Sequence, residues 1–130
     1  MDMKQFSIEI KNRVGELAKV TELMAEHAIN IVAIASESSG SRPMVRVVTE
    51  DQASTRKALS RSGRDFTEQD IIVIKMMDRP GELAKMARRL AREGINVESI
   101  YIFGKARGMT EIAIAVDDHK GAKKVLDIRD

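Results

Sequence analysis

The sequence contains two closely similar stretches, Arg13-Val14-Gly15-Glu16-Leu17-Ala18-Lys19 and Arg79-Pro80-Gly81-Glu82-Leu83-Ala84-Lys85, which lie 66 positions apart. Ten of the 23 residues from Asn12 to Ile34 are identical to the residue 66 places later, and Ile29-Asn30 returns in this way as Ile95-Asn96. Farther along the chain the shift becomes 67, which a one-residue insertion in a loop explains. The chain is therefore one unit repeated twice.

Within each unit the spacing of apolar residues changes in the same order, and this order predicts the elements. Apolar runs predict strands, and apolar residues at intervals of three and four predict helices, one of which runs from Pro80 to Glu93 with Gly94 as a left-handed stop. Asp51 and Asp118 are expected to cap a second helix in each unit, and Gly63 to end the first of these. The expected strands are 7–10, 29–34, 45–48 and 65–69 in the first unit, and 71–74, 95–102 and 111–116 in the second.

This order is strand, helix, strand, strand, helix, strand, which predicts an α+β fold of two ferredoxin-like βαββαβ units in tandem. We place the first unit at residues 1–69 and the second at residues 70–130. Only four residues follow Leu126, so the second unit is expected to lack most of its last strand and to leave the strand Ile71–Ile74 with an open edge. A unit of about 65 residues is only marginally stable alone, so the units are expected to pack on each other or on a second chain.

The composition excludes several classes of function. Of 130 residues, 43% are hydrophobic and 32% charged, with a formal net charge of +2, which is typical of a globular protein without a strong overall field. The absence of Cys excludes disulfides and thiolate metal sites and favours the cytoplasm, while His27 and His119 have no second ligand nearby, so no metal or cofactor is expected. No apolar run is long enough for a membrane span or a signal peptide, and no catalytic motif is present, so we expect neither a membrane protein nor an enzyme.

The stretch Asp78-Arg79-Pro80-Gly81-Glu82-Leu83-Ala84, followed after one helix by Gly94-Ile95-Asn96-Val97, resembles the ACT domain, the small-molecule regulatory module of amino-acid metabolism. The first unit is a weaker copy, in which Val14 replaces the Pro. Together the two copies are similar to free-standing tandem ACT proteins that bind amino acids. The resemblance implies an allosteric sensor of a free amino acid or an analogue, which forms a homodimer or a higher oligomer and acts on a regulated protein partner.

The motif also has a physical reason. A glycine at the strand-to-helix turn lets a ligand approach the backbone, and the helix that follows offers unpaired N–H groups that suit a carboxylate. Asp78 or Asn12 is expected to accept from the ammonium group, and Asn30 and Asn96 are expected at the same end of the sheet as the loop. The candidate ligand-binding residues are Asn12, Arg13, Val14, Gly15, Glu16, Leu17, Asn30, Asp78, Arg79, Pro80, Gly81, Glu82, Leu83 and Asn96.

Energetics place this site where one unit faces another. A helix terminus stabilises an anion by about 0.3–1 kcal/mol, whereas millimolar binding requires about 4 kcal/mol. The ligand must therefore be enclosed by several groups. The loop of the second unit is the better candidate for the ligand site, and the loop of the first unit could have a purely structural role. As an alternative to ligand binding, Asn30 and Asn96 could form hydrogen bonds only within their own turns.

Two rival functions remain open. The protein could be a ligand-free adaptor or regulator that uses ACT pairing only to bind another protein. It could also bind RNA through a basic helix that carries Lys85, Arg88, Arg89 and Arg92, but aromatic residues are only 3% of the chain and the sheet lacks those that stack on bases, so nucleic acid is not expected. Ile10 and Met76 stand where serine-binding relatives carry His, which disfavours a serine-type pocket.

Overall fold

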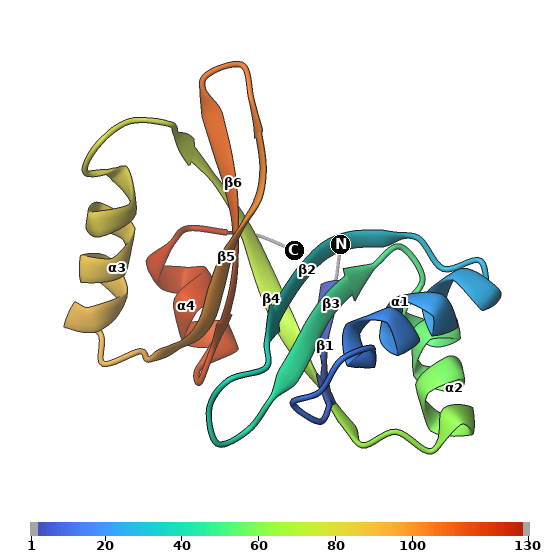
Figure 1. The fold of residues 1–130 in the computed structure, drawn as a ribbon. Coiled ribbons are helices and arrows are strands. Elements are labelled where there is room, and N and C mark those ends of the chain that lie inside the picture. Colours follow the sequence, from blue (N-terminus) through green and yellow to red (C-terminus); the bar gives the residue numbers. More distant parts are fainter. Residues whose placement is uncertain (1–2, 129–130) are drawn as a thin grey trace. The chain divides into compact units, whose positions relative to one another are not determined.

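The computed structural model describes residues 3–128, and Figure 1 shows its strands and helices. The elements in chain order are β1 (Met3–Glu9), α1 (Glu16–Glu26), β2 (Ile31–Glu37), β3 (Met44–Thr49), α2 (Gln52–Ser62), β4 (Phe66–Met77), α3 (Glu82–Arg92), β5 (Val97–Ala106), β6 (Met109–Val116) and α4 (His119–Val125).

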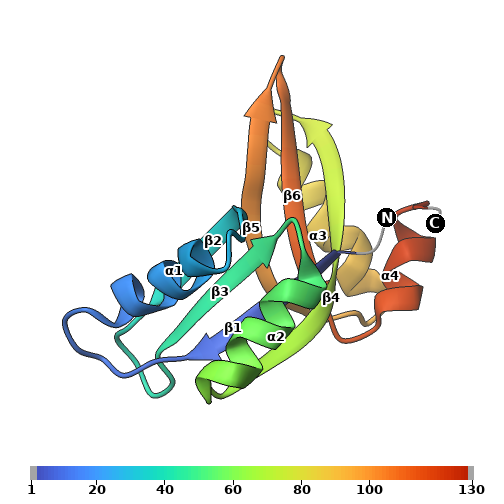
Figure 2. The same ribbon diagram turned by 90° about the vertical axis from the view of Figure 1, so that its right-hand side faces the viewer.

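The first compact unit comprises Met3–Gln69. Its strands lie in the order β2-β3-β1-β4, and β3 pairs antiparallel with both β1 and β2. Helices α1 and α2 cover one face of this sheet (Figures 1 and 2). The core between helices and sheet is built from Phe6, Ile8, Val20, Met24, Ile29, Val45, Val47, Ala58 and Leu59, with Phe66 packed against it.

The second unit begins at Asp70 and repeats this arrangement. Its strands lie in the order β4-β6-β5, with β6 antiparallel to both neighbours, and α3 and α4 cover one face (Figures 1 and 2). The core contains Ile72, Met86, Leu90, Ile95, Ile112, Ile114, Val116 and Ala122. The α+β fold of two ferredoxin-like units is therefore as the periodicity predicts.

The strand β4 belongs to both units, which the sequence did not predict. We expected separate strands at 65–69 and 71–74, whereas the structure has one strand of 12 residues. The amide of Glu9 donates to the carbonyl of Asp65 at 3.0 Å, next to the N-terminal part of β4, and Ile72–Met77 pair with β6. The expected break at Asp70 is wrong because no Gly or Pro interrupts the extended backbone there.

The chain after α4 folds back instead of forming a strand. The amide of Ile128 donates to the carbonyl of Lys123 at 2.8 Å, and Ile128 packs against the core of the second unit. Within residues 3–128 no strand follows α4, as the short C-terminal sequence predicts. The amide of Asp78 donates to the carbonyl of Gly108, in the turn just before β6, so by strand alternation the amides of Lys75 and Met77 point to the other edge of β4.

The helix termini confirm most of the capping predictions. The carboxylate of Asp51 accepts from the amide of Ser54 at 3.0 Å, and that of Asp118 accepts from the amide of Gly121 at 3.0 Å. Gly63 ends α2 with φ of 75°. The expected start of α3 at Pro80 is wrong: Pro80 lies in the preceding turn, and Gly81, in a left-handed conformation that the helix interior excludes, precedes the first helical residue.

Candidate functional site

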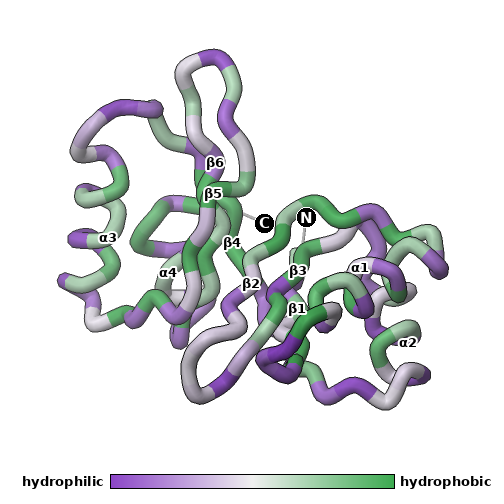
Figure 3. The backbone as a smooth tube through the Cα atoms, in the orientation of Figure 1, coloured by the Kyte–Doolittle hydropathy of each residue, from purple (hydrophilic) through white to green (hydrophobic). Residues whose placement is uncertain are grey.

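Each unit has a short loop between its first strand and its first helix, and both loops are hydrophilic in Figure 3. They end on Gly15 and Gly81, with φ of 90° and 89°. Neither α1 nor α3 has a side chain that caps its first turn. The first helical bonds run from the amide of Lys19 to Gly15 and from the amide of Lys85 to Gly81, both at 3.0 Å.

Two first-turn amides of each helix therefore remain available. Within residues 3–128, the amides of Leu17 and Ala18 in α1 and of Leu83 and Ala84 in α3 have no hydrogen-bond partner. Such amides carry the partial positive charge of the helix N-terminus. Both loops can in this respect receive a carboxylate, as the sequence predicts.

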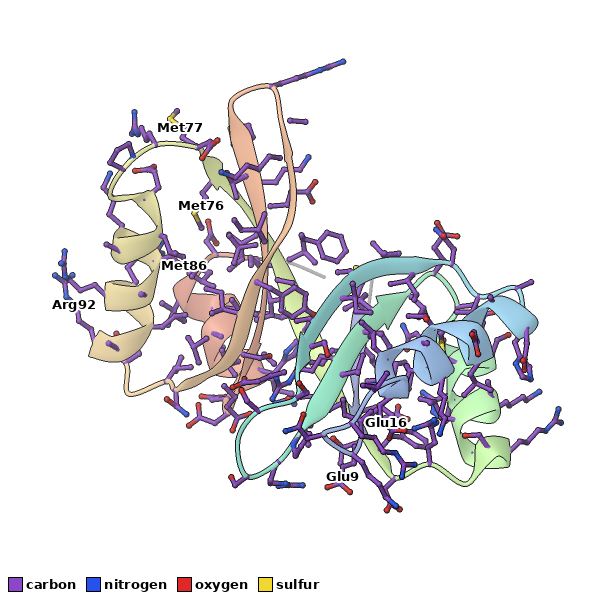
Figure 4. The ribbon with its side chains drawn as sticks, viewed as in Figure 1. Glu9, Glu16, Met76, Met77, Met86 and Arg92 are labelled. Carbon is purple, nitrogen blue, oxygen red and sulfur yellow. The ribbon has the colours of Figure 1, made fainter. Side chains whose placement is uncertain are left out.

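In the first unit, the side chain of Glu16 binds the start of the loop. Its Oε1 accepts from the amide of Lys11 at 3.0 Å, and its Oε2 lies 3.3 Å from Nε of Arg13 and 3.4 Å from Nζ of Lys19. The side chain is only 6% exposed (Figure 4). The Lys11 amide above all, with the two cations, lowers the pKa of Glu16 from 4.5 to about 2. The first loop thus binds a carboxylate of its own.

The second loop is more open. Glu82 pairs with Nζ of Lys85 at 3.1 Å and with Nε of Arg79 at 3.4 Å, and the Lys85 hydrogen bond lowers its pKa. Met77 takes the place of Lys11 in the repeat, but within the described part of the chain its amide makes no hydrogen bond to Glu82. The Glu82 side chain is 16% exposed. The Glu82 carboxylate thus pairs with Arg79 and Lys85 without the backbone contact that Glu16 makes at the start of its loop.

A cavity of about 140 Å³ lies beside the second loop. Asp78 and Lys105, paired at 3.3 Å between Oδ1 and Nζ, provide charges in its lining, and Figure 4 shows Met76 between the end of β4 and α3. Thr110 also lines it; this residue is 5% exposed, and its Oγ1 is buried without a hydrogen-bond partner among residues 3–128. The full lining is Met76, Met77, Asp78, Arg79, Glu82, Leu83, Ile102, Lys105, Thr110 and Ile112.

The hollow beside the first loop has a different character. It measures about 620 Å³ and is lined mainly by charged groups from the loop, from α1 and from the segment after α2. Its lining residues are Glu9, Ile10, Lys11, Arg13, Glu16, Lys19, Ser62, Gly63, Arg64 and Asp65. This mainly charged lining contrasts with that of the second cavity, where Met76, Met77, Leu83, Ile102 and Ile112 provide half of the lining residues.

The expected position of Asn30 and Asn96 beside the loop of their own unit is wrong. Glu9 pairs with Met44, which also pairs with Glu37. The C-terminal ends of β1 and β2 therefore lie at the same end of the sheet, where the first loop begins. Ile31 pairs with Thr49 at the opposite edge, about 20 Å away over the length of β2. The reason is that α1 runs back across the sheet, so that β2 begins where α1 ends.

Each Asn instead joins the end of its own hairpin. The amide nitrogen of the Asn30 side chain donates to Glu50 at 3.1 Å, and the carbonyl of Asn30 accepts from the Glu50 amide at 3.2 Å. The amide of Asn96 donates to the Asp117 carboxylate at 2.9 Å, and its carbonyl accepts from the Asp117 amide at 3.1 Å.

The structure adds residues that the sequence did not indicate. Ile102, Lys105, Thr110 and Ile112 come from β5 and β6 and line the cavity beside the Asp78–Leu83 loop. They carry no motif, and only the pairing of β4 with β6, which sets Met76 opposite Thr110, brings them to the loop. The alignment of the two repeats was the one signal that could have located this hairpin.

Other site classes find little support among residues 3–128. They contain no group of three or more His, Cys, Asp or Glu side chains that could hold a metal ion. No helix among them has the length and apolar character that crossing a bilayer requires. In the basic helix α3, Lys85 pairs with Glu82 and Arg89 donates to the carbonyl of Val125, so two of its four cations have partners within the chain.

Comparison with known proteins identifies the kind of unit. The family model of the ACT domain pair matches residues 1–129. Protein BT0572 from Bacteroides thetaiotaomicron is similar in structure, with 28% identity, a TM-score of 0.86 and coverage of 98% of this chain and 88% of that chain. No curated protein gives a significant sequence match.

More distant structures share the fold. The ligand-free regulatory subunit of aspartate kinase from Thermus thermophilus is 24% identical, with a TM-score of 0.69 and coverage of 97% of this chain and 91% of that chain. Aspartokinase III of E. coli, in complex with lysine and aspartate, is 14% identical, with a TM-score of 0.58 and coverage of 96% and 29%.

Proposed function

The chain belongs to the family of ACT domain pairs, and on that premise we propose that it is a regulatory protein, not an enzyme, which binds a free amino acid or a close analogue. The ligand is held at the loop before α3, and its occupancy is reported through a change in how ACT units or chains pack. The first unit serves as a structural partner, because the Glu16 carboxylate is already bound within its loop by the Lys11 amide and by Arg13.

One observation carries this proposal: the free amides of Leu83 and Ala84 lie at the start of a helix beside a cavity with apolar walls and a buried, unpaired hydroxyl. The amides suit the carboxylate of an amino acid. The cavity suits its side chain. The Asp78 carboxylate provides an acceptor for its ammonium group.

The free energies agree with weak metabolite binding. Burial of about 100 Å² of apolar ligand surface contributes about 2.5 kcal/mol, and a helix terminus adds about 0.3–1 kcal/mol. Millimolar affinity requires about 4 kcal/mol, so a further group is needed. We expect Asn30 or Asn96 of a second copy of the chain to supply it, which couples ligand binding to oligomerisation.

The relatives support the same class of function by analogy of fold. The regulatory subunit of aspartate kinase and aspartokinase III, the latter crystallised with lysine and aspartate, share the arrangement of elements. At 24% and 14% identity this likeness does not identify the ligand of the present chain.

Thermal melting of the full chain against each of the twenty amino acids tests the proposal. At a ligand concentration ten times Kd, binding adds about 1.4 kcal/mol to the free energy of unfolding, which raises Tm by about 4 °C. Gly81→Asp places a carboxylate at the start of α3 and is expected to remove the shift, whereas Gly15→Asp, the matched change in the first unit, is expected to keep it. No shift with any amino acid at 10 mM would overturn the proposal.

The alternative of a ligand-free adaptor is favoured by one observation. Several large apolar side chains are exposed on both units, namely Val14, Leu17, Ile34, Met77, Leu83, Ile100 and Ile102. If these exposed side chains bind a regulated protein without a ligand, a stable partner should co-purify with the chain. That partner should stay bound when amino acids are added or removed.

A further inference from the structure

We propose that Thr110 selects the ligand, so that the second unit binds an α-amino acid whose side chain is short, largely apolar and equipped with one hydrogen-bonding atom. This inference rests on the proposed function and names the substrate class of the same site. It depends on three features of the cavity: the hydroxyl of Thr110, the apolar walls and the Asp78–Lys105 pair.

Thr110 places a polar hydroxyl at a position of β6 where the neighbouring inward-facing residues are apolar. It lies on β6 opposite Met76, and it alternates in step with Ile112 and Ile114, which face the core under α3 and α4. A buried hydroxyl without a partner lowers stability, whereas Val would fill the same space without that cost. Thr110 lines the cavity, so its hydroxyl has a use if a bound ligand reaches it and forms a hydrogen bond with it.

The rest of the cavity restricts the size and polarity of the occupant. Its apolar walls include Met76, Leu83, Ile102 and Ile112. A cavity of about 150 Å³ accommodates a molecule the size of benzene, with about six heavy atoms, and this one measures about 140 Å³. It therefore accommodates a short side chain, and among its lining residues Thr110 is the uncharged polar one that such a side chain can contact.

Asp78 and Lys105 fix the orientation of the ligand. Their side chains are 45% and 52% exposed, and an ion pair so open to water contributes little to stability, so it separates at small cost. The ammonium group of an amino acid can then replace Lys105 at the Asp78 carboxylate, and the released Lys105 can bind the ligand carboxylate together with the amides of α3. The charged end stays at the mouth and the side chain enters the cavity.

The first unit lacks these features. At a shift of 66, the residue equivalent to Asp78 is Asn12, which has no carboxylate, and the residue equivalent to Ile102 is the polar Ser36. At a shift of 67, the residue equivalent to Thr110 is Pro43, which has no hydroxyl. A ligand that requires all three features is thus specific to the second unit.

Two pairs of isosteric ligands test the proposal by calorimetric titration of the full chain. Threonine and valine differ by a hydroxyl in place of a methyl, and methionine and norleucine differ by a sulfur in place of a methylene. We expect the polar member of at least one pair to bind at least tenfold more tightly than the apolar member. Thr110→Val should reduce that preference to less than threefold, and Thr110→Ser, which retains the hydroxyl, should preserve it.

Controls separate this inference from a folding defect and from the proposed function. Without ligand, Thr110→Val should melt at the same temperature as the parent or higher, because the hydroxyl that it removes has no partner. Lys105→Gln should weaken both members of a pair by the same factor, about tenfold, without changing the preference. If the parent protein binds both members of each pair equally, or if the preference persists in Thr110→Val, the selective role of Thr110 is overturned and the proposed function stands. Absence of binding by all twenty amino acids overturns the proposed function as well.

Discussion

Glu16 and Glu82 occupy the same position of the repeat, yet they leave their loops in different electrostatic states. Glu16 is almost fully buried and accepts the amide of Lys11, whereas Glu82 is paired only with Arg79 and Lys85. The Glu16 carboxylate thus joins the first turn of α1 to the start of its loop, a contact that Glu82 does not make in the second unit. A single backbone hydrogen bond, from the Lys11 amide to Glu16, accounts for this difference between the two loops.

The first prediction concerns the pH dependence of stability. Because folding lowers the pKa of Glu16 from 4.5 to about 2, its contribution to stability is present above pH 4.5 and is lost as the pH falls toward 2. Glu16→Gln should therefore lower the free energy of unfolding at pH 7 and flatten its decrease between pH 4.5 and 2. Urea unfolding at a series of pH values measures both effects. Glu22→Gln, on the exposed side of the same helix, is the control and should leave the slope unchanged.

The second prediction concerns the left-handed glycine of the binding loop. Nothing lies within 4 Å of a Cβ placed on Gly81, so a substitution there is strained only through its φ of 89°. Gly81→Ala should destabilise the protein by about 1–2 kcal/mol, and Gly81→Asn by less, since Asn tolerates this conformation. Equal losses for the two variants in chemical denaturation would contradict this explanation.

At this scale the sequence predicts backbone geometry better than contacts. The need for Gly15 and Gly81 follows from the turn that must join a strand to a helix. The position of Asn30 was mispredicted although the predicted order of strand, helix and strand already places the start of β2 at the end of the sheet opposite the loop, because the helix runs back across the sheet. The role of Thr110 was not predictable, because it depends on the strand opposite and on the absence of a partner.

Among the elements, the second helix of each unit depends most clearly on a single cap. Asp51 accepts both the amide and the hydroxyl of Ser54, at 3.0 and 2.6 Å, and these bonds lower its pKa. The sequence predicted both this cap and that of Asp118, because an N-cap interaction spans only three residues. It did not predict the continuity of β4, which depends on strand partners that lie far away in the chain.

The third prediction tests this cap. Asp51→Ala should lower the free energy of unfolding by about 1 kcal/mol, because the first-turn amide of Ser54 loses its acceptor. Asp51→Asn retains an acceptor oxygen and should recover most of that loss. Denaturation at pH 7 compares the two; a loss of the same size for Asp51→Asn would assign the effect to charge instead of to the hydrogen bond.

For the whole molecule, the two units differ in how their sheets end. The first unit has four strands, whereas the second has three within residues 3–128, with the amides of Lys75 and Met77 directed away from β6. An exposed strand edge of this kind pairs readily with another chain. We therefore expect copies of the chain, where they associate, to pair along this part of β4.

The fourth prediction follows from this edge. In dilute solution the amides of Lys75 and Met77 should exchange with solvent much faster than those of Ile74 and Met76, which point to β6. If copies associate through this edge, protection of Lys75 and Met77 should rise with protein concentration. Hydrogen exchange followed by NMR measures both; protection of Lys75 and Met77 that equals that of Ile74 at every concentration would contradict an open edge.

The single strand β4 also restricts how the duplicated chain can change in length. Phe66 packs against the core of the first unit, while Ile72, Ile74 and Met76 contact that of the second, and all four numbers are even. Alternation in a strand has a period of two. Inserting one residue near Asp70 would move the apolar side chains of one part of β4 to the opposite face of the sheet, away from the helices of their own unit. Inserting two residues would return them to the original face. The junction between the two repeats therefore tolerates only insertions or deletions of even length.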